Sequence, residues 1–350
     1  GKMSFFKVMN GTVRRDMLLR NNTTGDSERA AAAYRDIIAK YPGSEEAQVA
    51  MQDLKGIYVE TGRVDELAGI ADGITESEMD SLTYMAAEKA YGRGDRRDAK
   101  EKMEVYLAKY PGGAYSADCH FYMGMMLKEE GNDKEALNHL EKLYAGAENR
   151  YTGEAMSLAA DIHFTGGNYK EAKNLYIKIE ETGSDVERTR LARARIMEAA
   201  YNLKEYDVTK EYATVLTADD TTPAQLKMKA LYCRAKANIA TGNDSSAIED
   251  LAVLADDTGT AEGAEAKYQL AQLLFDREQY KDCEKVVLEY IEVSTPHSYW
   301  LARSFILLSD TYLKQGKRME AKQYLISLRS NYNGDDDIAG MIEKRLAALK

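Results

Sequence analysis

Apolar and polar positions follow one another along this chain with the spacing of paired amphipathic helices. A turn is followed five places later by a small residue, after four more by a large apolar residue, and after three more by another apolar residue. The last three positions lie on one face of a helix. The pattern therefore predicts helical hairpins in which the second helix is amphipathic.

The same turn recurs at a nearly constant interval through most of the chain. The mean stride is about 36 residues, which is typical of repeats built from two helices. Gly tolerates the left-handed backbone conformation that ends a helix, which explains why most of these turns contain Gly. The equivalent positions, called turn residues below, are Gly25, Gly62, Gly94, Gly131, Gly167, Lys204, Gly242, Glu278 and Gly316.

The residue five places after the turn residue is small in most repeats. A helical hairpin with closely spaced backbones accommodates only a small side chain where its helices cross. Leu67 breaks this column in the second repeat, and the step from Gly62 to Gly94 is the shortest in the chain, so we expect a local irregularity there. The other members of the column are Ala30, Ala99, Ala136, Ala172, Thr209, Ala247, Cys283 and Ala321.

The four prolines support the same register. Pro42, Pro111, Pro223 and Pro296 each fall close to half a repeat after a turn residue. Proline breaks the interior of a helix, so these positions are expected to separate one hairpin from the next.

Several hairpins resemble the tetratricopeptide repeat. In one of them the likeness is carried by Ala160, Gly167, Asn168, Ala172 and Tyr176, and in another by Gly124, Leu127, Gly131, Ala136 and Leu140. The resemblance implies an all-α fold. It would be a right-handed superhelical α-solenoid of about nine helix-turn-helix units, closed by a C-terminal capping helix.

We accordingly expect a single array over residues 1–333 and a capping helix within 334–350. Residues 1 to 24 supply at most a poor first helix. The expected units lie near 11–43, 44–78, 79–112, 113–149, 150–186, 187–223, 224–260, 261–297 and 298–333.

Two junctions between hairpins carry a narrower resemblance. The stretches around Tyr41-Pro42 and Tyr110-Pro111 are similar to repeats of two bacterial envelope proteins. These are the periplasmic cell-division coordinator of the Tol–Pal system and the lipoprotein of the outer-membrane assembly machine. The resemblance implies an exported bacterial protein, periplasmic or outer-membrane-associated, that acts in a larger envelope complex. A cytoplasmic location stays open.

Composition narrows the range of partners. The chain carries 47 Lys and Arg against 58 Asp and Glu, and its net charge of -11 would repel the phosphates of a nucleic acid. No apolar run approaches the ~18 residues that a membrane span needs. We therefore expect a protein or peptide partner, no nucleic acid and no membrane span.

No group of residues in the sequence points to catalysis. His120, His139, His163 and His297 form no closely spaced pair on one helix, so a zinc site has no scaffold in the sequence. There is no serine nucleophile elbow and no Gly-rich phosphate loop. Asp335, Asp336 and Asp337 lack the ligand spacing of a calcium loop and are expected to cap the last helix. We predict a non-enzyme without catalytic residues, cofactor or metal.

The first helices of tetratricopeptide arrays line the concave face of the superhelix, so the resemblance places candidate partner contacts there. Aromatic and Met side chains on a rigid groove suit an extended or helical peptide. Another interpretation stays open, in which the rings pack between neighbouring first helices away from solvent. The candidates are Tyr84, Glu88, Tyr91, Phe121, Met125, Lys128, Asp161, Phe164, Glu198, Tyr201, Tyr232, Lys236, Tyr268, Gln272, Phe275, Ile306, Asp310 and Leu313.

Two functions remain as hypotheses. The first is a non-catalytic scaffold that binds a peptide or protein, within envelope assembly or maintenance. The second is a carbohydrate-capturing surface lipoprotein of a nutrient-uptake system, which also builds on such hairpins. Glycan binders of that type carry long insertions, whereas no interval here is much longer than the two-helix repeat itself, so the scaffold is favoured.

Overall fold

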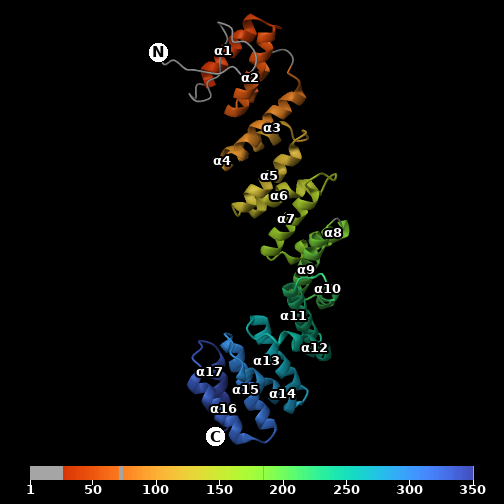
Figure 1. Cartoon of the computed structure of the whole chain (residues 1–350), viewed down its shortest axis with the longest axis vertical. Coiled ribbons are helices and arrows are strands. Elements are labelled where there is room, and N and C mark those ends of the chain that lie inside the picture. The colour runs from red at the N-terminus through yellow and green to blue at the C-terminus, as the bar shows by residue number, and fades with distance from the viewer. Residues whose placement is uncertain (1–26, 71–73, 184, 350) are drawn as a thin grey trace. The chain divides into compact units, whose positions relative to one another are not determined.

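The computed structural model describes residues 27–70, 74–183 and 185–349, which contain α-helices, one 3-10 helix and no β-strand (Figure 1). The expected all-α array of helical hairpins is confirmed. The first helices are α2 (Glu45–Thr61), α3 (Glu76–Gly92), α5 (Ser116–Glu129), α7 (Thr152–Thr165), α9 (Val186–Asn202), α11 (Ala224–Ala240), α13 (Ala261–Asp276) and α15 (Ser298–Lys314). The second helices are α1 (Ser27–Lys40), η1 (Val64–Gly69), α4 (Arg96–Lys109), α6 (Asp133–Tyr144), α8 (Tyr169–Thr182), α10 (Tyr206–Ala218), α12 (Asp244–Leu254), α14 (Tyr280–Glu292) and α16 (Arg318–Asn331), and α17 (Ile338–Ala348) follows them.

The chain divides into two compact units, unit 1 up to Ala155 and unit 2 from Met156. In unit 1, α3 packs on α4 and α5 on α6. In unit 2 each second helix also packs against the first helix that follows it, as α8 does with α9 and α10 with α11. Gly25 and the helix expected before it lie outside the described residues. The expected limits of the repeats stay a prediction.

The turn residues have the backbone conformation that the repeat requires. Gly62, Gly94, Gly131, Gly167, Gly242 and Gly316 all have φ between 72° and 80°. Among the described residues that are not Gly, only Lys204 and Glu278 have a positive φ, and both have a φ of 61°. These are the two turn residues at which the repeat departs from Gly. The left-handed conformation is therefore imposed by the hairpin and not by the glycine.

The helices of a hairpin cross at two small residues. A Cβ atom added to Gly124, seven places before its turn residue, would stand 2.8 Å from Leu140 and 3.6 Å from the Ala136 carbonyl. In the last hairpin the equivalent residue is Ser309, whose hydroxyl donates to the Ala321 carbonyl at 3.0 Å. The predicted small column of the second helices is fully buried from Ala99 to Ala321. In α1 the buried residue is Ala31, one place later than expected, and Ala30 is only partly buried.

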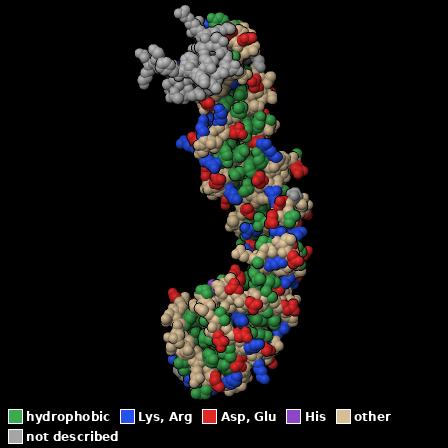
Figure 2. All heavy atoms as spheres, viewed as in Figure 1, with side chains coloured by type: hydrophobic (Ala, Val, Ile, Leu, Met, Phe, Trp, Pro, Cys, Tyr) green, Lys and Arg blue, Asp and Glu red, His purple; other side chains and the backbone are tan. Residues whose placement is uncertain are grey.

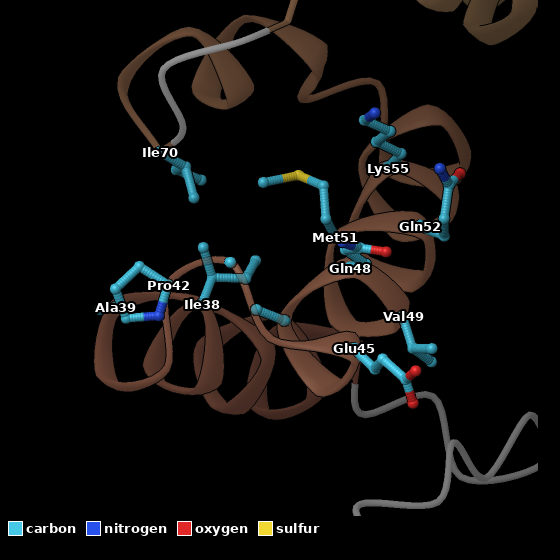
Figure 3. Close-up of a pocket in the computed structure, with 12 residues that line it drawn as sticks. Ile38, Ala39, Pro42, Glu45, Gln48, Val49, Met51, Gln52, Lys55 and Ile70 are labelled. Atoms are coloured by element: carbon cyan, nitrogen blue, oxygen red, sulfur yellow. The ribbon is translucent and has the colours of Figure 1, made fainter.

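The irregularity expected in the second repeat is confirmed. Its second helix is only the short 3-10 helix η1, and Leu67 is fully buried within it. Lys55 stands where the other first helices mostly carry Gly, Ala or Ser, so both small columns are broken in this repeat. A hollow of about 1140 Å³ lies beside η1, between α1 and α2 (Figure 3). Ile38, Met51 and Ile70 are among the residues that line it.

The ends of the helices agree with the sequence pattern. Pro42, Pro111 and Pro296 lie between helices, and Pro223 stands immediately before α11. Before the last helix, a carboxylate oxygen of Asp336 accepts the backbone N–H of Ile338 at 3.0 Å. One member of the acidic triplet thus binds the first backbone N–H of α17, whereas Asp337 at the N-cap position makes no side-chain capping hydrogen bond.

Overpacking the crossing should destabilise the protein. Ala136→Leu adds three carbon atoms at a fully buried site, so we expect it to lower the free energy of unfolding by about 1–3 kcal/mol. Asn138→Leu, on the exposed side of the same helix, should change it by less than about 0.5 kcal/mol. Urea unfolding measures both, and equal losses would show that the crossing is not tightly packed.

Replacing the two strained turn residues with Gly should stabilise the protein. Lys204 and Glu278 carry a side chain on a left-handed backbone, which is strained. Lys204→Gly and Glu278→Gly remove that strain, and we expect each to raise the free energy of unfolding by about 0.5–1 kcal/mol. Lys178→Gly, at an exposed site inside α8, should lower it by about 1 kcal/mol. Thermal unfolding of the three variants provides the comparison, and a loss at both turn residues would contradict the assignment.

Candidate partner-binding face

The candidate site is a face built from the first helices, here called the first-helix face. Residues 13, 10, 6 and 3 places before each turn residue lie on one side of their helix, because these spacings follow the helical period. We call these sets row 13, row 10, row 6 and row 3. The candidates named from the sequence occupy rows 10, 6 and 3.

The structure sorts those candidates by burial. Tyr84, Phe121 and Tyr268 of row 10 are only 5 to 7% exposed, and Ile306 of the same row is 3% exposed. Glu88 is exposed. The remaining candidates are half-buried, namely Tyr91, Met125, Lys128, Asp161, Phe164, Glu198, Tyr201, Tyr232, Lys236, Gln272, Phe275, Asp310 and Leu313. Row 10 thus belongs largely to the packing, while row 3 and parts of row 6 reach solvent.

In unit 1 the buried part of the face is organised around one carboxylate. The side chain of Asp118 in row 13 is 6% exposed. It accepts hydrogen bonds from the hydroxyls of Tyr84 at 3.4 Å and Tyr151 at 2.9 Å, and it forms an ion pair with Arg150. Burial raises the pKa of the Tyr84 hydroxyl, which therefore stays a donor. This carboxylate ties α3 to α5 and to the start of α7.

In unit 2 a polar contact joins each first helix from α9 onward to the next. Lys229 of row 13 pairs with Glu198 of row 6 at 2.6 Å, and Lys236 of row 6 pairs with Glu265 of row 13 at 2.5 Å. Arg303 then donates to the hydroxyl of Tyr268 at 2.7 Å. Several side chains that the sequence analysis selected as partner contacts therefore bridge neighbouring repeats, namely Glu198, Lys236 and Tyr268.

The last first helix is joined to the cap in the same way. Arg345 of α17 binds both carboxylate oxygens of Asp310, with its shortest contact at 2.6 Å. Paired guanidinium–carboxylate hydrogen bonds are among the strongest in proteins, so this contact fixes α17 on the end of the array.

Row 10 also stacks on rings that the sequence analysis did not select. Phe121 stacks on Tyr151 and Tyr84 on Tyr115, each with centroids 4.3 Å apart. Tyr268 stacks on the single tryptophan, Trp300, at 5.6 Å. The partner ring always precedes the next turn residue by 16 places, and this constant offset is the signal that could have revealed it.

The part of the face that remains accessible in unit 1 is a tyrosine cluster. Tyr91 and Tyr122 lie 4.7 Å apart between ring centroids, and the guanidinium of Arg96 lies 4.7 Å above the Tyr91 ring. Tyr122 also meets the half-buried Tyr151 edge-on at 6.5 Å. Figure 2 shows hydrophobic side chains, tyrosines included, gathered over the region of α3 to α6. These rings are held by one another and keep one side toward solvent.

Two histidines meet across the α5–α6 hairpin, which the sequence analysis did not foresee. The Nδ1 atoms of His120 and His139 lie 2.9 Å apart. A search for pairs within one helix could not find them, because they stand on different helices. Burial, with the charge of His139 and Lys142 in support, lowers the pKa of His120 to about 4, and burial also lowers that of His139.

Other candidate chemistry is limited. Among the residues that the structure describes, no three His, Cys, Asp or Glu side chains gather in a way that could hold a metal ion. The three cysteines are buried, and burial raises their thiol pKa to about 12 at Cys119 and about 11 at Cys233 and Cys283. Within the same described ranges, no helix combines the length and apolar character of a membrane span.

Among the comparisons with known proteins, a family model agrees with the repeat character of the chain. A family model described as a tetratricopeptide repeat matches residues 15–44. The chain is similar to the crystal structure of a tetratricopeptide repeat protein from Parabacteroides merdae, with 14% identity, 78% of this chain and 100% of that chain covered, and a TM-score of 0.41. It is also similar to the apo form of the quorum sensor NprR from B. thuringiensis (10% identity, 87% and 98% covered, TM-score 0.37) and to yeast Tom70 (12% identity, 95% and 66% covered, TM-score 0.39). No curated protein matches this chain.

The histidine pair should make stability depend on pH. The folded state resists protonation of both rings, whereas the unfolded chain takes up protons near pH 6.5. The contribution of this pair to the free energy of unfolding is thus fully present above about pH 6.5 and is lost as the pH falls toward 4. Replacing both residues, as His120→Gln with His139→Gln, should flatten this dependence in thermal unfolding between pH 7 and 4. His297→Gln, which changes a half-buried histidine outside this pair, is the control and should keep the wild-type slope.

Proposed function

We propose that this chain is a non-catalytic scaffold that binds a peptide or protein partner on its first-helix face. The observation that carries the proposal is the half-buried set of rings on that face. Tyr91, Tyr122 and Tyr151 in unit 1 are each held by ring contacts while part of each ring meets solvent. A rigid aromatic surface of this kind contributes a large contact area at low cost in side-chain entropy.

The polar groups beside the rings fit a peptide ligand. Glu88 is exposed, and Met125 and Lys128 are half-buried on the next first helix. Aromatic, Met and charged side chains together can meet both the side chains and the backbone groups of a peptide. The bridged carboxylates of rows 13 and 6 hold the helices at fixed separations, so the surface is formed before a partner arrives.

A carbohydrate-capturing surface lipoprotein is the second candidate. The tyrosine cluster of unit 1 favours it, because flat rings with a hydroxyl at the edge offer an apolar face and a polar group to one ligand. The repeats carry no insertion that would build a separate glycan pocket, since the turn residues follow one another at nearly constant intervals. The peptide scaffold therefore remains the first candidate.

We also propose a setting in the bacterial envelope, periplasmic or at the outer membrane, in a larger complex for envelope assembly or maintenance. The support is the resemblance at the two Tyr-Pro junctions. In the second junction the Tyr106 hydroxyl binds Asp80 and accepts the Tyr115 N–H at 2.9 Å. Fractionation of the source cell checks the location, and recovery with the cytoplasmic fraction would contradict it.

Site-specific photocrosslinking in the source cell tests the partner. A photoreactive phenylalanine at Tyr122 or Tyr201 should capture the same protein partner in repeated experiments. The same probe at Val105 or Val253, which are each 49% exposed on second helices, should not capture it. Equal capture from both faces would contradict the proposal. Capture at Tyr122 that soluble oligosaccharides abolish would favour the carbohydrate candidate.

Stability and binding should separate in two variants. Tyr201→Ala truncates a half-buried ring, so it should cost less stability than Ala136→Leu but reduce capture of the partner several-fold. Thermal unfolding and crosslinking yield on the same samples measure both effects. A larger stability loss for Tyr201→Ala would show that the rows are wrongly placed.

A further inference from the structure

The hollow beside η1 lies in a repeat whose second helix ends early. η1 ends at Gly69, seven places after its turn residue Gly62. The second helix α6 ends at Tyr144, thirteen places after its turn residue Gly131. The second helix of this repeat is therefore about two turns shorter than α6. Repeats with a full second helix are called regular repeats below.

A regular repeat of unit 2 shows which contacts the last turns of a second helix make. Three side chains meet there, namely Glu180 of α8, Arg193 of α9 and Tyr212 of α10. Arg193 donates to the Glu180 carboxylate at 2.7 Å, and the Tyr212 hydroxyl donates to the same carboxylate at 2.8 Å. Counted from their own turn residues, these side chains stand thirteen places after, eleven before and eight after. A first helix and two successive second helices thus close on one another.

The contact between the places eleven before and eight after the turn residue recurs in other hairpins. His120 and His139 hold these places around Gly131, with their Nδ1 atoms 2.9 Å apart. Phe305 and Tyr324 hold them in the last hairpin, with ring centroids 6.1 Å apart. The chemistry of the pair changes from repeat to repeat, but the two helices meet there each time.

In the second repeat the three equivalent residues are apolar and surround the hollow of about 1140 Å³. They are Ile38, Met51 and Ile70, and each is half-buried. Figure 3 shows their side chains pointing into the hollow from α1, α2 and the end of η1. Val49, which also lines the hollow, is 55% exposed. The short second helix thus leaves apolar side chains around a space that regular repeats fill with their own helix.

The walls of the hollow favour a helical occupant. They are mainly the sides of α1 and α2, whose backbone groups bond within their helices and so do not pair with an extended chain. A helix satisfies its own backbone groups and needs only side-chain contact. The hollow also exceeds the ~300–1,000 Å³ of most small-molecule sites, which favours a chain segment over a small molecule.

One carboxylate sets the direction of the occupant. Glu45 and Lys55 line the hollow ten residues apart on α2, which corresponds to about 15 Å of helix. Lys55 is already paired with Glu78 at 2.5 Å. Among the residues that the structure describes, no side chain pairs with the exposed Glu45. A cation in the last turn of a helix antiparallel to α2 would meet this carboxylate, and helix C-termini favour cations.

We propose that the hollow binds an amphipathic helix of a partner protein, about three turns long, with one apolar side and a basic last turn. The apolar side would lie against Ile38, Met51 and Ile70, and the helix would complete the second repeat from outside the chain. The apolar residues would follow the helical period, as Leu140 and Leu143 do in α6. This surface goes beyond the proposed function, because its lining contains none of the rings of the first-helix face.

A designed helix tests the occupant. The probe is a fluorescein-labelled peptide of Ala, Leu, Glu and Lys, with leucines along one side and lysines in its last two turns. It is about 18 residues long, so that the helix forms in water. The control peptide has the same composition with the leucines distributed around the helix. Fluorescence anisotropy with the full chain should show at least tenfold tighter binding of the one-sided peptide.

Variants of the lining locate the binding. Ile38→Gln combined with Met51→Gln should weaken the one-sided peptide at least tenfold, because both changes remove apolar surface from the hollow. The matched control combines Val215→Gln with Val253→Gln, which are 40% and 49% exposed on second helices, and should leave binding unchanged. The comparison of the two peptides on the wild-type protein needs no variant, so it stands even where a variant unfolds.

A charge exchange at an exposed residue tests the direction. Glu45→Lys should weaken the one-sided peptide at least threefold and strengthen a version with glutamates in place of the lysines in its last two turns. Glu104→Lys makes the same charge change at an exposed site of α4 and should alter neither affinity. Salt should reduce the difference between the two peptides.

Crosslinking in the purified protein distinguishes the possible occupants. A photoreactive phenylalanine at Gln48, which is exposed and lines the hollow, should crosslink to the one-sided peptide. A crosslink to residues 1–26 of the same chain, or to a second copy of it, that the peptide does not displace would overturn the inference.

Three further outcomes would overturn it. They are equal or absent binding of the two peptides, an unaffected variant of Ile38 and Met51, and an unchanged charge preference in Glu45→Lys. The capture experiment at Tyr122 and Tyr201 judges the proposed function separately. If that capture persists while the designed helix fails, the scaffold stands and the hollow has no helical partner.

Discussion

The close crossing of two helices at a pair of small residues is the constraint on which the rest of this structure depends. Gly124 lies against Ala136 and Leu140 with no space for another carbon, and Ser309 reaches the backbone carbonyl of Ala321. At this separation the turn between the helices must take the left-handed conformation, which even Lys204 and Glu278 adopt. Where Lys55 and Leu67 replace both small residues, the second helix shrinks to η1. The loss of both small residues thus coincides with the loss of a full second helix in this repeat.

Hairpins formed in this way still need to be joined to one another, and polar contacts do much of that on the first-helix face. Row 13 of one hairpin meets rows 10 and 6 of the previous one, as Asp118 does with Tyr84 and Glu265 with Tyr232. Such buried and half-buried polar pairs contribute more through fixed geometry than through net free energy. They divide the face into rows that the array itself occupies and rows whose side chains keep part of their surface accessible.

The sequence was sufficient for the repeat and insufficient for the contacts between repeats. Turn residues, small columns and the irregular second repeat follow from the period of a single helix, so local spacing predicts them. The stacks of Tyr84 on Tyr115 and Tyr268 on Trp300 join residues that lie almost a full repeat apart. Their formation depends on how neighbouring hairpins dock, which no single helix encodes. The His120–His139 pair was missed for a different reason, because it joins the two helices of one hairpin and the search looked only within single helices. The one-residue error at Ala30 falls in the repeat whose turn residue, Gly25, lies outside the described residues.

The accessible rows then separate the two units by chemistry. In unit 1 the exposed ring surface is a cluster of tyrosines with the guanidinium of Arg96 stacked upon it, and Lys128 interrupts row 3. In unit 2 row 3 is apolar at every step, although polar contacts in the neighbouring rows already hold the helices together. A polar residue at Ile239 or Leu313 would keep those contacts and expose less apolar surface to water. The apolar character of the row is therefore not required by the joining of repeats, and this is what makes the row a candidate for partner contact.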